Sequence, residues 1–194
     1  ATCMAARSGA VSESYLQETV APVVLGRDPH DREAIFQELW VIDRHEAFFP
    51  VFLPGPVDVA LWDICAKEAG LPLYKYIGAY RDSLPVYASS NFLPTIQDYV
   101  DEALYYKSKG IKGYKAHPAG PAEFDMKVHA AVREAVGKDV KLRIDANQAW
   151  NAKQAVRILD QMQEKGLDIE FVEQPVPAAD LEGMQYVTRH ASVP

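Results

Sequence analysis

The chain has little cysteine, no run of lysine and arginine, and no long hydrophobic stretch. Two cysteines, Cys3 and Cys65, are too few for a disulfide framework, and the apolar helical pattern around Cys65 predicts a buried free thiol. This cysteine usage favours a reducing compartment, so we expect a cytoplasmic protein. Because no run of about 18 apolar residues occurs, no membrane partner is expected.

The charge balance is acidic. The 194 residues include 20 Lys and Arg against 27 Asp and Glu, which gives a net charge of -7 and a pI near 5.2. Without a basic stripe, a nucleic acid is not expected as a partner, and a small diffusible molecule is favoured. A hydrophobic content of 48% and a charged content of 24% are typical of a globular protein with a sizeable core.

Strand-like and helical segments alternate from Leu84 onward. Strands are expected to start at positions 84, 113, 140 and 169, spaced by roughly 28 residues, which is typical of a βα repeat in a parallel sheet. No G-x-G-x-x-G turn follows the first strand, which disfavours a dinucleotide-binding fold. The pattern therefore predicts an α/β fold of the (β/α) barrel type, with an open doubly wound sheet as the alternative.

The part before the repeat is different, because helical patterns separated by Gly/Pro breaks dominate it. We interpret residues 1–80 as the helical part of an α+β capping domain, and residues 81–194 as the first four βα units of a TIM-like barrel. The final "SVP" (192–194) can open a fifth unit. Since a closed barrel needs roughly twice as many units, we expect a sequence truncated at both ends, and either a homo-oligomer or association with the missing half of the barrel.

Two basic side chains share one face at the end of the second expected strand. In "GYKAHPAG" (113–120), the period of two puts Lys115 and His117 on the same side. This pair indicates either a solvated edge or a proton-transfer site.

Two acidic side chains end the next two strands, Asp145 in "VKLRIDAN" (140–147) and Glu173 in "IEFVEQP" (169–175). Reactive groups of α/β barrels lie at the carboxyl ends of strands. Neighbouring carboxylates repel unless a cation or proton lies between them, and oxygen ligands of this kind suit Mg²⁺. The alternative is that each acid pairs with a nearby Lys or Arg.

Other polar and aromatic residues are weaker candidates. Asn147 and Gln148 follow Asp145 into a loop, where they can contact a substrate or cap the next helix. Aromatic side chains near strand ends are expected mainly in packing; these are Tyr87 and Trp150. The remaining histidines are expected at the surface or at helix ends; these are His30, His45, His129 and His190.

Three segments resemble one known family. The segment "PVDVALWDICAKEAGLPLYKYIG" (56–78) is similar to the helix that leads from cap to barrel in the mandelate racemase and muconate lactonizing enzyme family of the enolase superfamily, and "RIDANQAW" (143–150) and "FVEQP" (171–175) are similar to its first two metal-ligand strands. The resemblance covers nearly the whole chain. It implies a Mg²⁺ ion held by Asp145, Glu173 and a third carboxylate beyond Pro194.

The resemblance also implies a reaction. Members of this superfamily remove the α-proton of a carboxylate substrate, with Mg²⁺ stabilising the enolate. The family usually has a K-x-K pair at the second strand, whereas this sequence has Lys115-Ala116-His117. His117 thus stands in the position of the basic lysine. It either acts as the base or, together with Lys115, only binds substrate oxygens.

Three functions follow as hypotheses. The polar rim favours a hydroxylated acid as substrate, and hence an acid-sugar dehydratase; it consists of Lys115, His117, Asn147 and Gln148. A racemase, epimerase or cycloisomerase of the same family is the nearest alternative. The third hypothesis is a catalytically incompetent fragment that lacks the third metal ligand.

Overall fold

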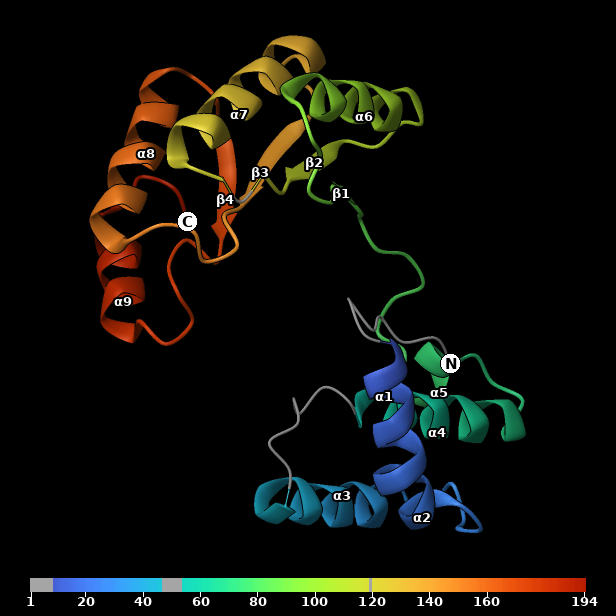
Figure 1. Cartoon of the computed structure of the whole chain (residues 1–194). Coiled ribbons are helices and arrows are strands. Elements are labelled where there is room, and N and C mark those ends of the chain that lie inside the picture. Colours follow the sequence, from blue (N-terminus) through green and yellow to red (C-terminus); the bar gives the residue numbers. More distant parts are fainter. Residues whose placement is uncertain (1–8, 47–53, 119) are drawn as a thin grey trace. The chain divides into compact units, whose positions relative to one another are not determined.

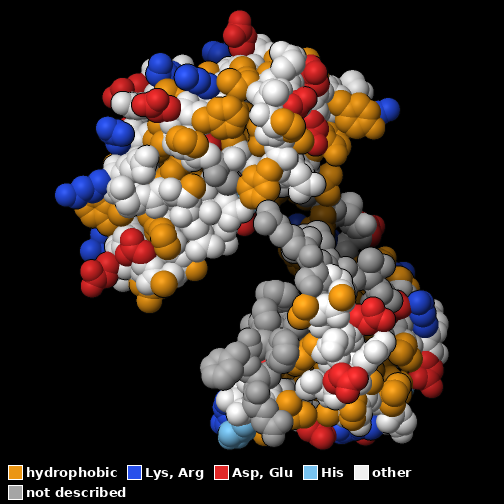
Figure 2. Space-filling model, in the orientation of Figure 1, with side chains coloured by type: hydrophobic (Ala, Val, Ile, Leu, Met, Phe, Trp, Pro, Cys, Tyr) orange, Lys and Arg blue, Asp and Glu red, His pale blue; other side chains and the backbone are white. Residues whose placement is uncertain are grey.

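The computed structural model of the chain describes residues 9–46, 54–118 and 120–194 (Figure 1). Backbone contacts divide the chain into two compact units, Ala1–Ser83 and Leu84–Pro194. No helix in the described ranges combines the length and the apolar character that crossing a bilayer requires. On the face that Figure 2 shows, acidic and basic side chains are interspersed rather than gathered by sign.

The described part of the first unit is helical. Its elements are α1 (Gly9–Tyr15), the π-helical turn η1 (Leu16–Val20), α2 (Ala21–Val24), α3 (Arg32–Glu46), α4 (Gly55–Glu68) and α5 (Leu73–Tyr76). A small core joins them, made of Tyr15, Val20, Ile35, Leu39 and Leu61. Cys65 is buried and free, as predicted, with its thiol 3.4 Å from the Pro29 carbonyl oxygen. Cys3 lies outside the described residues.

The second unit is a parallel sheet covered by helices, as the repeat predicted. Its elements are β1 (Ala88–Ser89), α6 (Ile96–Ser108), β2 (Gly113–Ala116), α7 (Ala122–Val136), β3 (Lys141–Asp145), α8 (Ala152–Glu164), β4 (Ile169–Glu173) and α9 (Leu181–His190). The strands lie in chain order, and Figure 1 shows the helices along one side of the sheet. Beside β4, the Val172 N–H donates to the Pro194 carbonyl oxygen at 2.9 Å.

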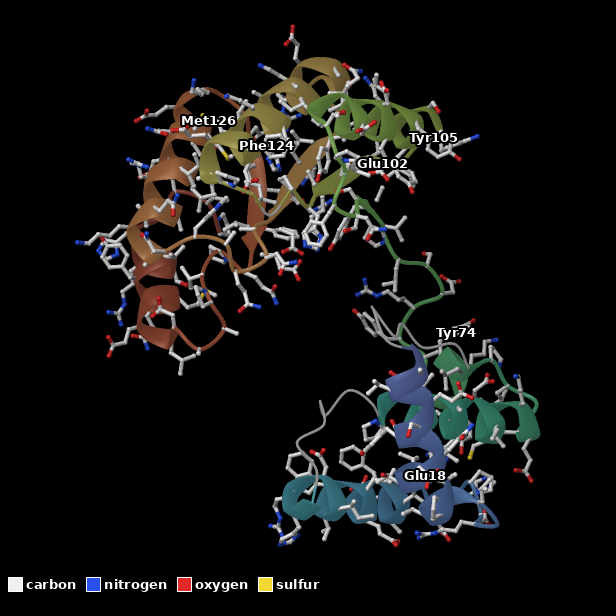
Figure 3. All side chains as sticks on the ribbon, in the orientation of Figure 1. Glu18, Tyr74, Glu102, Tyr105, Phe124 and Met126 are labelled. Carbon is white, nitrogen blue, oxygen red and sulfur yellow. The ribbon has the colours of Figure 1, made fainter. Side chains whose placement is uncertain are left out.

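The alternation along β3 places its apolar side chains against the helices. Leu142, Ile144 and the following Ala146 are fully buried there, together with Val128 and Leu159 from the helical layer. Phe124 and Met126 of α7 are partly buried against the same core (Figure 3). Because successive side chains of a strand point to opposite faces, Asp145 faces away from the helices.

Side chains cap three of the helices, because a short polar side chain can accept a bond from an unpaired N–H of the first turn. Thr95 and Asp98 form a reciprocal capping box at α6. Asn151 accepts from the Gln154 N–H at the start of α8, and Asp180 caps α9.

The first strand is shorter than predicted. A strand was expected to start at position 84, but only Ala88 and Ser89 pair with β2. The preceding Leu84 and Val86 are exposed, because β1 pairs along only one side in the described sheet.

One histidine prediction is wrong. His129 was expected at the surface or at a helix end, but it lies inside α7 and is fully buried. Its Nδ1 is 2.7 Å from the Asp125 carbonyl oxygen and its Nε2 is 3.4 Å from that of Arg143. Burial lowers the pKa of His129. The other predicted surface histidines are exposed, namely His30, His45 and His190.

Candidate metal and proton-transfer site

Three charged side chains meet at the carboxyl ends of β2, β3 and β4. Lys115 Nζ lies 3.0 Å from Asp145 Oδ2 and 2.6 Å from Glu173 Oε2. The two acids are direct partners in the register of β3 and β4. The side chains of Lys115 and Asp145 are 10% and 7% exposed, whereas that of Glu173 is 43% exposed. A buried cation thus lies between two carboxylates; we name these three residues the upper cluster.

Electrostatics in the upper cluster keep Lys115 charged. Burial by itself lowers the pKa of Lys115, but the hydrogen bonds and negative charges of Glu173 and Asp145 have the larger effect together, and the pKa is raised. The sequence left open whether the two acids pair with a nearby Lys or Arg. In this structure both pair with Lys115.

His117 lies directly after β2, on the side of Lys115. Its Nε2 is 3.6 Å from Asp145 Oδ2 and 2.9 Å from Asn147 Nδ2. Because an amide NH₂ group can only donate, Nε2 accepts, and the neutral ring carries its proton on Nδ1. The ring also packs against Phe92, with centroids 4.7 Å apart. Lys115 and His117 therefore share a face, as the period of two predicted.

Two residues that the sequence did not single out hold the backbone of His117. Ser90 Oγ accepts from the His117 N–H at 2.9 Å. The Tyr99 hydroxyl donates to the His117 carbonyl oxygen at 3.2 Å and accepts from the Leu93 N–H at 2.9 Å. Tyr99 occupies an ordinary apolar position of α6, so no sequence signal separates it from a core aromatic residue.

The loop after β3 brings one of its two candidate amides to the site. Asn147 and Gln148 have φ values of 45° and 65°, in the left-handed region. Asn147 reaches His117, whereas the Gln148 side-chain oxygen accepts from the Ala178 N–H at 2.8 Å, toward the loop after β4. Neither caps α8, because Asn151 does so.

A second charged group lies further along the same face of the sheet. Glu170 accepts a hydrogen bond from Lys141 at 2.7 Å and forms an ion pair with Arg143 at 2.5 Å. The Arg143 guanidinium lies 4.3 Å from the centre of the Tyr87 ring and 5.5 Å from that of Phe171. Tyr87 thus packs on a cation. We name Lys141, Arg143 and Glu170 the lower cluster.

Behind the loops lies a buried acid that the sequence analysis missed. Asp125 accepts from the Gly120 N–H at 3.2 Å and from the Trp150 indole N–H at 3.1 Å. Burial raises the pKa of Asp125 to about 6, although both hydrogen bonds oppose the rise. One signal was present in the sequence, because Asp125 stands three positions before Val128 on the apolar stripe of α7.

Asp145 and Glu173 fit a hard divalent cation in kind, since carboxylate oxygens are the ligands that Mg²⁺ prefers. Two carboxylates are fewer ligands than a full coordination shell needs, and no cluster of three or more acidic, histidine or cysteine side chains occurs within the described ranges. The position of Lys115 between the acids indicates that positive charge is favourable there. The pair is therefore suitable as part of a metal site.

Family models match both units. The mandelate racemase and muconate lactonizing enzyme N-terminal domain matches residues 2–78, and the enolase C-terminal domain-like family matches residues 98–194. The chain belongs to the mandelate racemase and muconate lactonizing enzyme family of the enolase superfamily. The resemblance of the three sequence segments is thus confirmed.

Relatives in this family catalyse different reactions. The chain is 36% identical over 188 residues to an L-Ala-D/L-Glu epimerase of Clostridium acetobutylicum, covering 94% of this chain and 49% of the relative. It is 38% identical over 170 residues to an L-talarate/galactarate dehydratase of Salmonella typhimurium, covering 84% and 42%. A cycloisomerase is also among the relatives. The chain spans about half the length of the curated relatives it matches.

A solved structure is also similar to this chain. A racemase from Streptomyces coelicolor with bound magnesium superposes with a TM-score of 0.87 at 26% identity, covering 97% of this chain and 53% of that one. The predicted barrel-type α/β fold is confirmed by this similarity. Bound magnesium in a family member agrees with the predicted cofactor at the level of the family.

Proposed function

We propose that this chain carries two Mg²⁺ ligands and a proton-transfer group of an enzyme that removes the α-proton of a carboxylate substrate. The observation that supports it most is the meeting of Lys115, Asp145, Glu173 and His117 at the carboxyl ends of adjacent strands. Reactive groups of α/β barrels lie at this rim. Membership in the family adds independent support.

Asp145 and Glu173 would hold the metal. When bound, Mg²⁺ supplies Lewis-acid stabilisation to the carboxylate group of the substrate. Burial lowers the pKa of Lys115, but the hydrogen bonds and negative charges of Glu173 and Asp145 together raise it, which favours the ammonium form beside these acids. Its ammonium group balances the two acids and offers hydrogen bonds to substrate oxygens.

His117 takes the proton in this proposal. Its Nε2 lone pair accepts from Asn147, so the substrate has to replace that contact before Nε2 can receive a proton. The Asn147 amide is then free to donate to a substrate oxygen. Ser90 and Tyr99 hold the backbone of His117 and keep the ring at the strand end during this exchange.

A hydroxylated acid is the substrate class that we favour, and dehydration is the favoured outcome. The rim presents an ammonium, an imidazole and an amide, which suit hydroxyl groups better than apolar ones. Loss of a β-hydroxyl after α-proton removal completes a dehydration. Similarity to a talarate/galactarate dehydratase is consistent with this substrate class.

Epimerisation is the second candidate, because an L-Ala-D/L-Glu epimerase is 36% identical over 94% of this chain. In that case the enolate is reprotonated at the same carbon from the opposite face, and no hydroxyl leaves. A third possibility is that the 194-residue chain is catalytically incompetent, since its described residues bring two carboxylates and no third to the proposed metal site.

Exchange of the α-proton with deuterated solvent tests the proposal. The 194-residue chain is incubated in D₂O with Mg²⁺ and either galactarate or the dipeptide L-Ala-L-Glu, and deuterium incorporation is followed by NMR. We expect exchange with galactarate and its loss in His117→Ala. The control is His190→Ala, which alters an exposed histidine on α9.

Each outcome of this experiment decides between the candidates. Exchange with the dipeptide alone favours the epimerase. Undiminished exchange in His117→Ala assigns the base role to another group and leaves His117 as an oxygen-binding residue. No exchange with either probe in the unaltered chain contradicts the proposal for this chain and favours the incompetent form.

A further inference from the structure

We propose that Asp125 is a positioning residue that ties the loop after β2 to the loop after β3, and thereby sets the contact between His117 and Asn147. The inference rests on the proposed function, in which both of these side chains face the substrate. It adds to the site a group that touches neither the metal ligands nor the substrate.

One carboxylate serves both loops. Asp125 lies in the first turn of α7 and is 0% exposed. One oxygen accepts from the backbone of Gly120, in the loop after β2, and the other accepts from the indole of Trp150, in the loop after β3. The two loops carry His117 and Asn147, whose side chains meet at 2.9 Å.

The other hydrogen bonds of each loop join it to elements on the side that faces away from the other loop. Backbone N–H groups at 146, 148 and 150 donate to carbonyl oxygens of residues 173, 174 and 175, which fixes the loop after β3 to the end of β4. The backbone of His117 is held by Ser90 and Tyr99, on the side of β1 and α6. Apart from the contacts of the His117 ring, the Asp125–Trp150 bond is the side-chain hydrogen bond that joins these loops in the described part of the chain.

A purely structural core residue does not explain this acid well. Burying a carboxylate costs free energy unless a cation pairs with it, and no ion pair to Asp125 occurs among the described residues. The cost is consistent with the raised pKa of its carboxyl group. What the carboxylate provides is two acceptor oxygens, each facing a donor from a different loop.

The test reads the His117 ring directly. The ¹⁵N resonances of the histidine rings are recorded for the 194-residue chain, with His117 assigned by its loss in His117→Gln. Asp125→Asn keeps the shape but leaves one acceptor oxygen for two donors, and Trp150→Phe removes the indole donor. We expect both variants to shift the His117 Nε2 resonance in the same direction, toward a nitrogen without the Asn147 bond, and the double variant to add no further shift.

Glu102→Gln is the matched control. Glu102 lies on α6 (Figure 3) and accepts from the Tyr114 hydroxyl at 2.7 Å, so this change also removes an acid with a hydrogen-bonded partner. We expect the His117 Nε2 resonance to stay unchanged in this variant. Thermal unfolding of every variant is measured in parallel.

One outcome overturns the inference. If Asp125→Asn and Trp150→Phe lower the unfolding temperature but leave the His117 Nε2 resonance unchanged, the role of Asp125 is purely structural. An equal shift in Glu102→Gln also overturns it, because the effect is then not specific to the Asp125 link. The resonance is recorded without metal or substrate, so its result does not depend on whether the α-proton exchange experiment succeeds.

Discussion

The two charged clusters on the sheet have opposite composition. The upper cluster places one cation between two acids, Asp145 and Glu173, whereas the lower cluster places one acid, Glu170, between two cations. With all groups ionised, one Lys against one Asp and one Glu leaves one negative charge, and one Lys and one Arg against one Glu leave one positive charge. Of the two clusters, only the upper one therefore has a net negative charge that attracts an added cation.

The lysines of the two clusters differ in burial. The Lys115 side chain is 10% exposed and the Lys141 side chain 67%, whereas the other members overlap, with Asp145 at 7% and Glu173 at 43% against Arg143 at 14% and Glu170 at 31%. Charges held away from water interact more strongly and cost more to leave unpaired. The net negative charge supports the upper cluster as the proposed metal site, whereas the lower cluster has a net positive charge and packs its Arg143 guanidinium under two aromatic rings.

Removing the lysine of each cluster gives the largest expected difference in stability. Lys115→Met leaves Asp145 buried beside a second acid, and we expect the free energy of unfolding to fall by about 3 kcal/mol. Lys141→Met removes a largely exposed ion pair and should cost less than about 1 kcal/mol. Urea unfolding in the presence of a chelator measures both. Equal losses would contradict the distinction between the clusters.

Added Mg²⁺ should change the stability of the two lysine variants differently. We expect millimolar Mg²⁺ to restore part of the stability of Lys115→Met, because an ion that binds only the folded state stabilises it. The same addition should leave Lys141→Met unchanged relative to the unaltered chain.

The two clusters should make their stability depend on pH at opposite ends of the pH scale, the upper cluster at alkaline pH and the lower cluster at acidic pH. The pKa of Lys115 is raised in the folded state, so its stabilisation is complete below its unfolded value and is lost as pH rises through the folded value. Hydrogen bonding to Lys141 lowers the pKa of Glu170, so its smaller contribution is present above its unfolded value and is lost as pH falls through the folded one. When the free energy of unfolding is plotted against pH, Lys115→Met should therefore lose the decrease at alkaline pH. Glu170→Gln should lose part of the decrease at acidic pH.

The smallest expected effect concerns the aromatic cover of the lower cluster. Tyr87→Leu removes a ring that lies 4.3 Å from the Arg143 guanidinium, and we expect a loss of about 0.5 kcal/mol in the free energy of unfolding. Chemical denaturation measures it, and Arg143→Lys in the same background tests the pairing. A Tyr87→Leu change that alters Mg²⁺ binding would show that the clusters are not independent.

Local patterns in the sequence were enough to predict most of the fold of the second unit. The repeat of strands and helices predicted the parallel sheet, and the period of two along the second strand predicted that Lys115 and His117 share a face. These features depend on neighbours along the chain and on the geometry of parallel strands. For the same reason, the length of β1 was overestimated, because strand pairing depends on a partner that a local pattern does not show.

The supporting contacts of the site could not be predicted in the same way. Asp125 and His129 lie on the buried stripe of α7, whose period indicates their burial but not the distant partners of their hydrogen bonds. The direction of Gln148 depends on the left-handed backbone of its loop. Long-range hydrogen bonds of this kind leave no periodic trace in the sequence.

Magnesium titration by calorimetry tests the central claim most directly. The 194-residue chain is titrated beside Asp145→Asn, which removes a proposed ligand, and Glu170→Gln, which removes the acid of the lower cluster. We predict Mg²⁺ binding that weakens by about two orders of magnitude in Asp145→Asn and stays within about twofold in Glu170→Gln. Absence of Mg²⁺ heat at millimolar concentration in the unaltered chain, or an equal loss in both variants, would contradict the assignment of the metal site to Asp145 and Glu173.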